Sequence, residues 1–284
     1  MMKIRMSLMG VLAVIVLLAG AAAAVEKEQA AAIRELFKKN QDAVIGLSAI
    51  VKREGSGPAA RMFGDKERKV QFNGVIIDPS GLTVSSLTSL SGSLGGIIMM
   101  MGGERQDMKS DYSDVKMRLA DGTEIPARVV MKDQDLDLVF IMPDPAEGKK
   151  LPAFPFIKLE KSPKVEIMDS LCAINRMGEN LDFQAMVGTG YVSGLVTKPR
   201  TFICFEGEGM HGVGMAVFNM EGKTVGISVY RKGGGATVIL PSEDVMDEAK
   251  QALEKAKSAG NEDKKDDKKD DKKEDKKEEK KGDK

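Results

Sequence analysis

The sequence has few aromatic residues and no net charge. Tryptophan is absent, the aromatic content is 5%, and 43 basic residues balance 43 acidic ones. A surface that binds nucleic acid needs a basic patch to neutralise phosphates and aromatic rings on which bases stack. The composition therefore excludes nucleic acid from the expected partners.

Histidine and cysteine are scarce as well. The chain has one histidine, His211, and two cysteines, Cys172 and Cys204. One histidine and two cysteines in apolar strand patterns are too few ligands for a zinc site, so we expect no metal. We expect no other cofactor either. We predict two buried free thiols, with a disulfide as the alternative if the protein is exported to an oxidising compartment.

The N-terminal residues have the pattern of a secretory signal. Lys3 and Arg5 precede an apolar run from Leu8 to Ala19, and small residues continue to Ala24. This pattern predicts a signal peptide over residues 1–24, cleavage near Ala24, and a periplasmic or extracellular protein. An uncleaved membrane anchor is the alternative, and only in that case do we expect contact with a membrane.

The C-terminal residues, 261–284, alternate acidic residues with pairs of lysine and contain no apolar side chain. A helix would bring like charges together on one face, which opposes helix formation. We predict a disordered charged tail. Weak electrostatic contact with envelope polymers is its alternative, functional interpretation.

Helical spacing within residues 25–42 changes to alternation of apolar and polar residues further along the chain. The alternation predicts a β-barrel in residues 43–148, a second in residues 149–241, and then a helix over residues 242–260. The fold class is therefore all-β, with two six-stranded antiparallel β-barrels and flanking N- and C-terminal helices. The candidate strands are 45–51, 70–76, the segment after a turn at 78–81, 115–119, 124–132 and 136–142, then 170–174, 187–196, 201–206, 214–219, 223–230 and 236–240.

Two stretches, Asn73–Leu90 and His211–Ile227, resemble the HtrA/Deg family of trypsin-fold serine proteases. In that family the first stretch ends in Thr-Asn-Asn-His-Val-Val and supplies the base. The second reads Gly-Asn-Ser-Gly-Gly-Ala-Leu and supplies the nucleophile. Residues 119–139 and 239–242 are similar to two further segments of the family, in the same order. The resemblance implies a catalytic cleft between two trypsin-like barrels, and the charged tail stands where the family's PDZ domain would begin.

The resemblance also assigns roles to individual positions, and the reactive ones hold other residues. Thr88 stands at the position of the base, Val213 at that of the nucleophile and Asp137 at that of the orienting carboxylate. His211 and Gly212 stand in the loop that forms the oxyanion hole. Acyl transfer needs both a nucleophile and a base, so we expect no hydrolysis. Asp137 either meets the Thr88 hydroxyl or hydrogen-bonds nearby backbone.

His211 leaves one enzymatic alternative open. A solvated loop histidine is the simpler interpretation, but a serine across the cleft could form a reactive pair with it. Such a pair would give a serine endopeptidase with a non-standard site, and a serine hydroxyl within hydrogen-bonding distance of His211 would reveal it. The candidate serines are Ser85, Ser86 and Ser89.

A run of five large apolar residues, flanked by glycine pairs, follows the former base position. Burial of such side chains is strongly favourable, so exposure of all five is not expected. The run is predicted to plug the vacated cleft or to form a docking surface for a partner, with a soft-metal thioether site as a third alternative. Its residues are Ile97, Ile98, Met99, Met100 and Met101.

The function expected from the sequence is that of an exported, catalytically inactive HtrA-like pseudoprotease. It would bind a polypeptide or a partner protein at the vestigial cleft, where a strand can be added to a sheet edge. The resemblance also allows a homo-oligomer, because family members often trimerise through their N-terminal segment. The alternatives are the endopeptidase that uses His211 and a structural component of the envelope.

Overall fold

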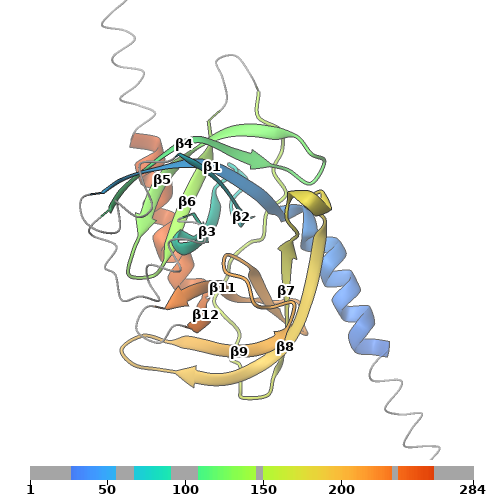
Figure 1. Ribbon diagram of the computed structural model, residues 1–284. Helices are drawn as coiled ribbons and strands as arrows, with labels where there is room; N and C mark the ends of the chain where they lie inside the picture. The colour runs from blue at the N-terminus through green and yellow to red at the C-terminus, as the bar shows by residue number, and fades with distance from the viewer. Residues whose placement is uncertain (1–26, 56–66, 91–107, 145–149, 232–235, 259–284) are drawn as a thin grey trace, which may run out of the picture.

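The computed structural model describes residues 27–55, 67–90, 108–144, 150–231 and 236–258. In these ranges the chain folds into two closed six-stranded antiparallel β-barrels that follow one another in sequence and stack in space (Figure 1). The predicted fold class is thereby confirmed. None of the helices in the described ranges is long and apolar enough to span a membrane.

The N-terminal barrel closes in the strand order β1-β2-β3-β6-β5-β4. Its interior holds apolar side chains from alternate positions, such as Leu47, Phe72 and Met117. The helix α3 (Leu87–Leu90) follows β3 directly. The strands are β1 (Val44–Gly55), β2 (Arg68–Ile76), β3 (Thr83–Ser86), β4 (Met108–Arg118), β5 (Glu124–Asp133) and β6 (Leu138–Pro143).

The C-terminal barrel closes in the order β10-β11-β12-β9-β8-β7. Both faces of β7 are buried, because Leu171 and Ala173 join one apolar cluster while Cys172 and Ile174 join another. The strands are β7 (Ser170–Arg176), β8 (Ala185–Val196), β9 (Phe202–Glu208), β10 (Ala216–Asn219), β11 (Thr224–Arg231) and β12 (Ala236–Pro241).

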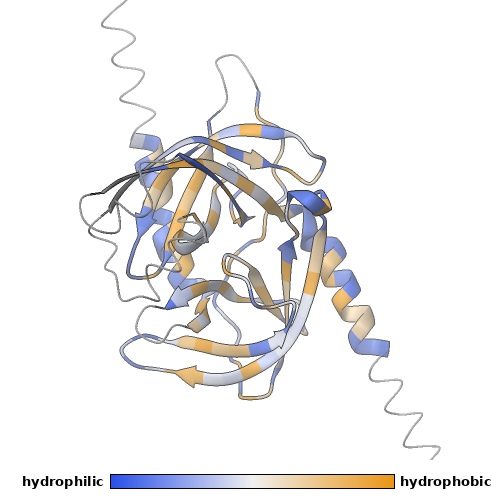
Figure 2. Ribbon diagram, viewed as in Figure 1, coloured by the Kyte–Doolittle hydropathy of each residue, from blue (hydrophilic) through white to orange (hydrophobic). Residues whose placement is uncertain are grey.

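A shared apolar core joins the two barrels to the C-terminal helix, residues 242–258. The cluster combines Phe140 of β6 and Phe218 of β10 with Val245 and Ala249 of the helix. Figure 2 shows apolar residues along the strands of both barrels and polar residues mixed with them along the helices. Burial of apolar surface from both barrels and the helix stabilises their arrangement.

Two tight turns join β2 to β3 and β4 to β5, at the turn signals Asp78-Pro79-Ser80-Gly81 and Asp121-Gly122. The carboxylates of Asp78 and Asp121 accept hydrogen bonds from the N–H groups two residues later, both at 2.9 Å. Gly81 and Gly122 have φ values of 86° and 85°, which glycine adopts without steric cost. Local turn chemistry therefore sets these two strand connections.

Serine is a common N-cap residue, so the sequence predicts that Ser242 caps the C-terminal helix, but the structure differs. The Ser242 hydroxyl donates to Thr224 O (3.2 Å), and the Ser242 N–H donates to Ser162 Oγ (2.7 Å). The Glu243 carboxylate accepts the Ser162 N–H (2.8 Å). The reason is tertiary, because neighbouring segments offer these groups partners outside the helix.

The two cysteines are unpaired, and β8 lies between the strands that carry them. Cys172 is buried, as predicted, whereas Cys204 is only half-buried. Burial raises the pKa of the Cys172 thiol to about 12. The thiolate is the reactive form, so Cys172 is protected both by its protonation and by its surroundings.

We expect a thiol-specific alkylating reagent at pH 8 to modify native protein at Cys204 and to leave Cys172 unmodified. Peptide mass mapping after a timed pulse measures this. Cys204→Ser is the matched control, and it should leave the native protein unlabelled until denaturant is added. Fast labelling of Cys172 in that variant at pH 8 would contradict the burial argument.

Candidate functional site

A groove of about 470 Å³ lies between the two barrels. One wall is residues 68–73 of β2, and Thr88 and Ser89 of α3 stand beside it. Gly212 and Val213 of the C-terminal barrel complete the lining together with Asn175. Thr88 and Val213, which are 125 residues apart in the chain, therefore lie on the same groove.

Asp137 is buried beneath Thr88 and ends the turn between β5 and β6. The sequence predicted a strand over residues 136–142; instead the φ of Asp137 is 60°, and β6 begins at the next residue, Leu138. This left-handed conformation, which aspartate tolerates better than most residues, separates Asp137 from the ladder. Its carboxylate is directed towards hydrogen-bond donors instead.

The Asp137 carboxylate accepts hydrogen bonds on both oxygens. Thr88 Oγ1 (2.7 Å) and Thr88 N (2.9 Å) donate to Oδ1. Ser86 Oγ and Tyr230 N donate to Oδ2, the latter at 2.9 Å. Both interpretations of Asp137 are therefore correct together, since it meets the Thr88 hydroxyl directly and also binds backbone. A buried carboxylate satisfied in this way is structural.

Gly214 brings the loop that carries Val213 close to the N-terminal barrel. Its φ is 76°, a conformation that favours glycine. A Cβ atom at this position would lie 2.7 Å from Ser85 Oγ and 3.0 Å from Asn73 O. The two barrels can approach this closely only because residue 214 has no side chain.

Ser228 of β11 holds the same loop from the other side. Its carbonyl accepts the Gly214 N–H (2.7 Å), and its hydroxyl accepts the Met215 N–H (2.9 Å). Because of these bonds and the left-handed conformation of Gly214, strand pairing begins only after Met215. β10 therefore begins at Ala216, two residues later than predicted.

His211 is exposed on this loop, and within the described ranges it forms no hydrogen bond, ion pair or ring contact. The hydroxyl of Ser85 donates to a carbonyl of β2, and that of Ser86 donates to Asp137. Ser89 lines the groove, but among the described residues no hydrogen bond joins it to His211. The described residues thus contain no serine–histidine pair.

The sequence did not reveal the polar contacts that join the barrels beside the groove. Asn73 of β2 donates through its amide to Asn175 Oδ1 and to Arg176 O, the latter at 2.9 Å. The main-chain N–H of Tyr230, in β11, donates a hydrogen bond to Asp137 Oδ2. Asn73 begins the first family-like stretch, which was the only available signal. Its partners are more than 100 residues away and follow no local pattern.

Arg176 is a second residue that the sequence did not single out. Although almost fully buried, its guanidinium donates to three carbonyls: Val44 O, Phe183 O (2.8 Å) and Gln41 O (3.0 Å). Desolvation lowers its pKa, and the nearby Asp42 carboxylate acts in the opposite direction. Arg176 thereby ties the start of β1 to the C-terminal barrel.

No protein-family model matches this chain, and no curated protein matches it. The two closed six-stranded antiparallel barrels are consistent with a trypsin-like fold. Three sequence predictions lie outside the described residues: the signal over residues 1–24, the apolar run of residues 97–101 and the charged tail over residues 261–284.

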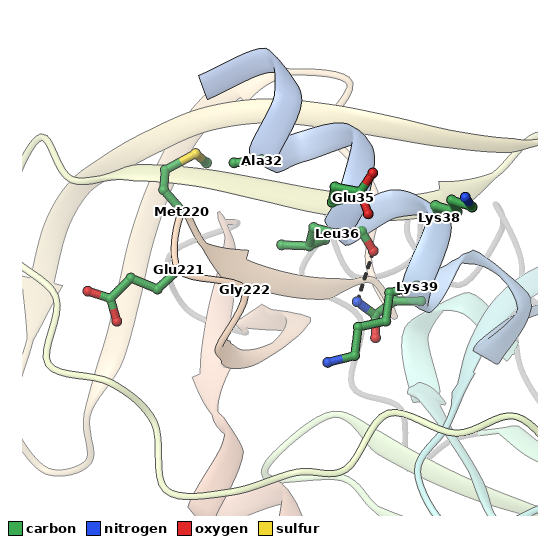
Figure 3. Close-up of a pocket in the computed structure, with 9 residues that line it drawn as sticks. Ala32, Glu35, Leu36, Lys38, Lys39, Met220, Glu221 and Gly222 are labelled. Atoms are coloured by element: carbon green, nitrogen blue, oxygen red, sulfur yellow. Dashed lines mark hydrogen bonds between the residues drawn. The ribbon is translucent and has the colours of Figure 1, made fainter. Parts of the chain in front are cut away.

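A second groove, of about 630 Å³, lies between the N-terminal helix (residues 27–40) and the turn after β10 (Figure 3). Its charged side chains are Glu35, Lys38, Lys39 and Glu221, two of each sign. No group of three or more His, Cys, Asp or Glu that could hold a metal occurs in the described part of the chain. We take the groove between the barrels as the candidate site, because Thr88 and Val213 line it.

Proposed function

We propose that this protein is an exported, catalytically inactive pseudoprotease of the HtrA/Deg type that binds an extended polypeptide in the groove between its barrels. The observation that carries the proposal is the edge of β2. β2 pairs with β1 over residues 68–75 but with β3 only at Val75 and Ile76. Its first half therefore has one edge turned towards the groove.

The direction of the backbone groups on that edge follows from Asn73. Its carbonyl accepts the Ser85 hydroxyl and therefore points away from β1. In an antiparallel ladder the polar groups of alternate residues point to the same side. The N–H and C=O groups of Gln71 and Lys69 are thus directed towards the groove, where an added strand would pair with them.

Among the described residues, the two positions that the resemblance assigns to the nucleophile and the base, Val213 and Thr88, hold neither group. Val213 has no nucleophilic atom and Thr88 has no group that titrates near neutral pH. Asp137, at the position of the orienting carboxylate, is buried and accepts hydrogen bonds on both oxygens. A groove that keeps the free edge of β2 but has no nucleophile or base would bind a strand without cutting it.

We expect the purified protein to show no serine-hydrolase activity. A fluorophosphonate probe should label no serine, and casein should remain intact on a gel. Val213→Ser should stay inactive, because a serine without a base is a weak nucleophile. Stoichiometric labelling of any serine in the unaltered protein would contradict the proposal.

We expect the protein to bind reduced and carboxymethylated α-lactalbumin, an unfolded chain, and not native α-lactalbumin. Gln71→Pro removes the N–H that faces the groove and should weaken binding at least about tenfold, which corresponds to about one hydrogen bond. Gln71→Ala loses the same side chain but keeps the N–H, so it should bind at least about threefold more tightly than Gln71→Pro. Surface plasmon resonance measures both variants. Equal loss in the two would rule out backbone pairing at β2.

A further inference from the structure

A carboxylate of the protein itself, that of Glu179, contacts two side chains that line the groove, Lys69 and Gln71. Lys69 and Gln71 are two residues apart on β2, so their side chains lie on the same face of the strand. Gln71 Nε2 donates to Glu179 Oε2, and Lys69 Nζ lies 3.8 Å from the same oxygen. An ammonium group and an amide N–H directed at one oxygen form a position that binds carboxylates.

We propose that the polypeptide bound in this groove is acidic, and that one of its carboxylates replaces Glu179 at Lys69 and Gln71. This inference rests on the proposed function, because it names the chemical class of the polypeptide that binds there. Glu179 then acts as a built-in competitor for the position. Its carboxylate occupies the position when no acidic segment is present.

The charge of the groove wall favours the same ligand. Arg68 and Lys69 line the groove, and none of the lining residues in the described ranges is acidic. A strand added beside β2 would bring every second side chain to the face that carries Lys69 and Gln71. Acidic residues at alternate positions would therefore meet positive charge, whereas a basic peptide would be repelled.

Glu179 can leave this position without releasing the loop that carries it. It begins the short turn η3 (Glu179–Leu181), and 64% of its side chain is exposed, so its ion pair is weak. The loop is held separately by Phe183. The Arg118 guanidinium lies 5.0 Å from the centre of its ring, and its carbonyl accepts a hydrogen bond from Arg176 (2.8 Å).

The test uses three dye-labelled octapeptides in which threonine alternates with glutamate, glutamine or lysine. Fluorescence anisotropy at about 50 mM and about 300 mM salt measures their affinities. We expect the glutamate peptide to bind about tenfold more tightly than the glutamine peptide at low salt, and the lysine peptide to bind least. The difference should shrink at high salt, because salt screens exposed charges.

Single substitutions distinguish the role of Glu179 as a competitor from the role of Lys69 in binding. Glu179→Gln should tighten the glutamate peptide about threefold, because the competing charge is gone. Lys69→Glu should weaken it about tenfold and tighten the lysine peptide. Lys164→Glu makes the same charge change at a lysine that is 87% exposed outside the groove, and it should have no effect.

Two negative outcomes have different meanings. If the glutamate and glutamine peptides bind equally and Glu179→Gln changes nothing, the ligand is not acidic, although binding along β2 stands. If neither the peptides nor unfolded α-lactalbumin bind, the proposed function itself is overturned, and this inference falls with it.

Discussion

Replacing Arg176 by methionine is expected to lower the free energy of unfolding by about 3 kcal/mol. Three main-chain carbonyls, of Gln41, Val44 and Phe183, lose their donor. Each unsatisfied buried acceptor costs about 1–3 kcal/mol, and partial access to water reduces the total. For a protein of this size the change corresponds to a melting temperature lower by roughly 6–12 °C. Urea and thermal unfolding followed by circular dichroism measure both quantities.

Two further variants test the geometric part of this argument. Arg176→Lys keeps the positive charge, but one ammonium group cannot reach three carbonyls in different directions, so it should recover less than half of the loss. Arg200→Met is the matched control, because Arg200 is partly exposed and pairs with Asp244 at the surface. We expect its effect to stay below about 1 kcal/mol. An Arg176→Met protein as stable as the unaltered one would show that the carbonyls find other partners.

Asp137→Asn is expected to destabilise the protein by about 2–3 kcal/mol. The main-chain N–H of Thr88 donates to Oδ1, and that of Tyr230 donates to Oδ2. Neither N–H can reverse its direction, so the amide nitrogen of asparagine would face a donor in either orientation. One buried donor would then remain unsatisfied and the two barrels would lose a polar contact. Urea unfolding measures the change.

Asp135→Asn makes the same chemical change two residues earlier in the same turn, at an exposed side chain. We expect it to alter the free energy of unfolding by less than about 0.5 kcal/mol. Equal destabilisation in the two variants would mean that the turn itself, and not the bonds to the Asp137 carboxylate, is responsible.

The apolar pattern was sufficient to predict two barrels and most of their strands. In a strand, alternate side chains face opposite sides, so the burial of Leu47, Phe72 and Met117 is visible as a period of two. Where backbone conformation changed locally, the pattern failed. Gly214 and Asp137 have positive φ values, and each delays the start of the following strand by a residue or more.

The candidate site was predictable only in part. The family-like stretches singled out Thr88, Asp137 and Val213, and the contact between Thr88 and Asp137 is present at 2.7 Å. The other hydrogen-bond donors to Asp137 could not be inferred, because every residue except proline has a main-chain N–H such as that of Tyr230. For the same reason the sequence did not show which strand edge borders the groove.

Most strands, the tight turns and the lack of a nucleophile and base at the positions that the resemblance assigns to them could be predicted, because each depends on residue type and near neighbours. How the two barrels join and what lines the groove could not. Arg176 and Val44 are 132 residues apart, and Gln71 and Glu179 are 108 apart. Such contacts depend on how two closed barrels pack against each other, and packing at that distance leaves no periodicity along the chain.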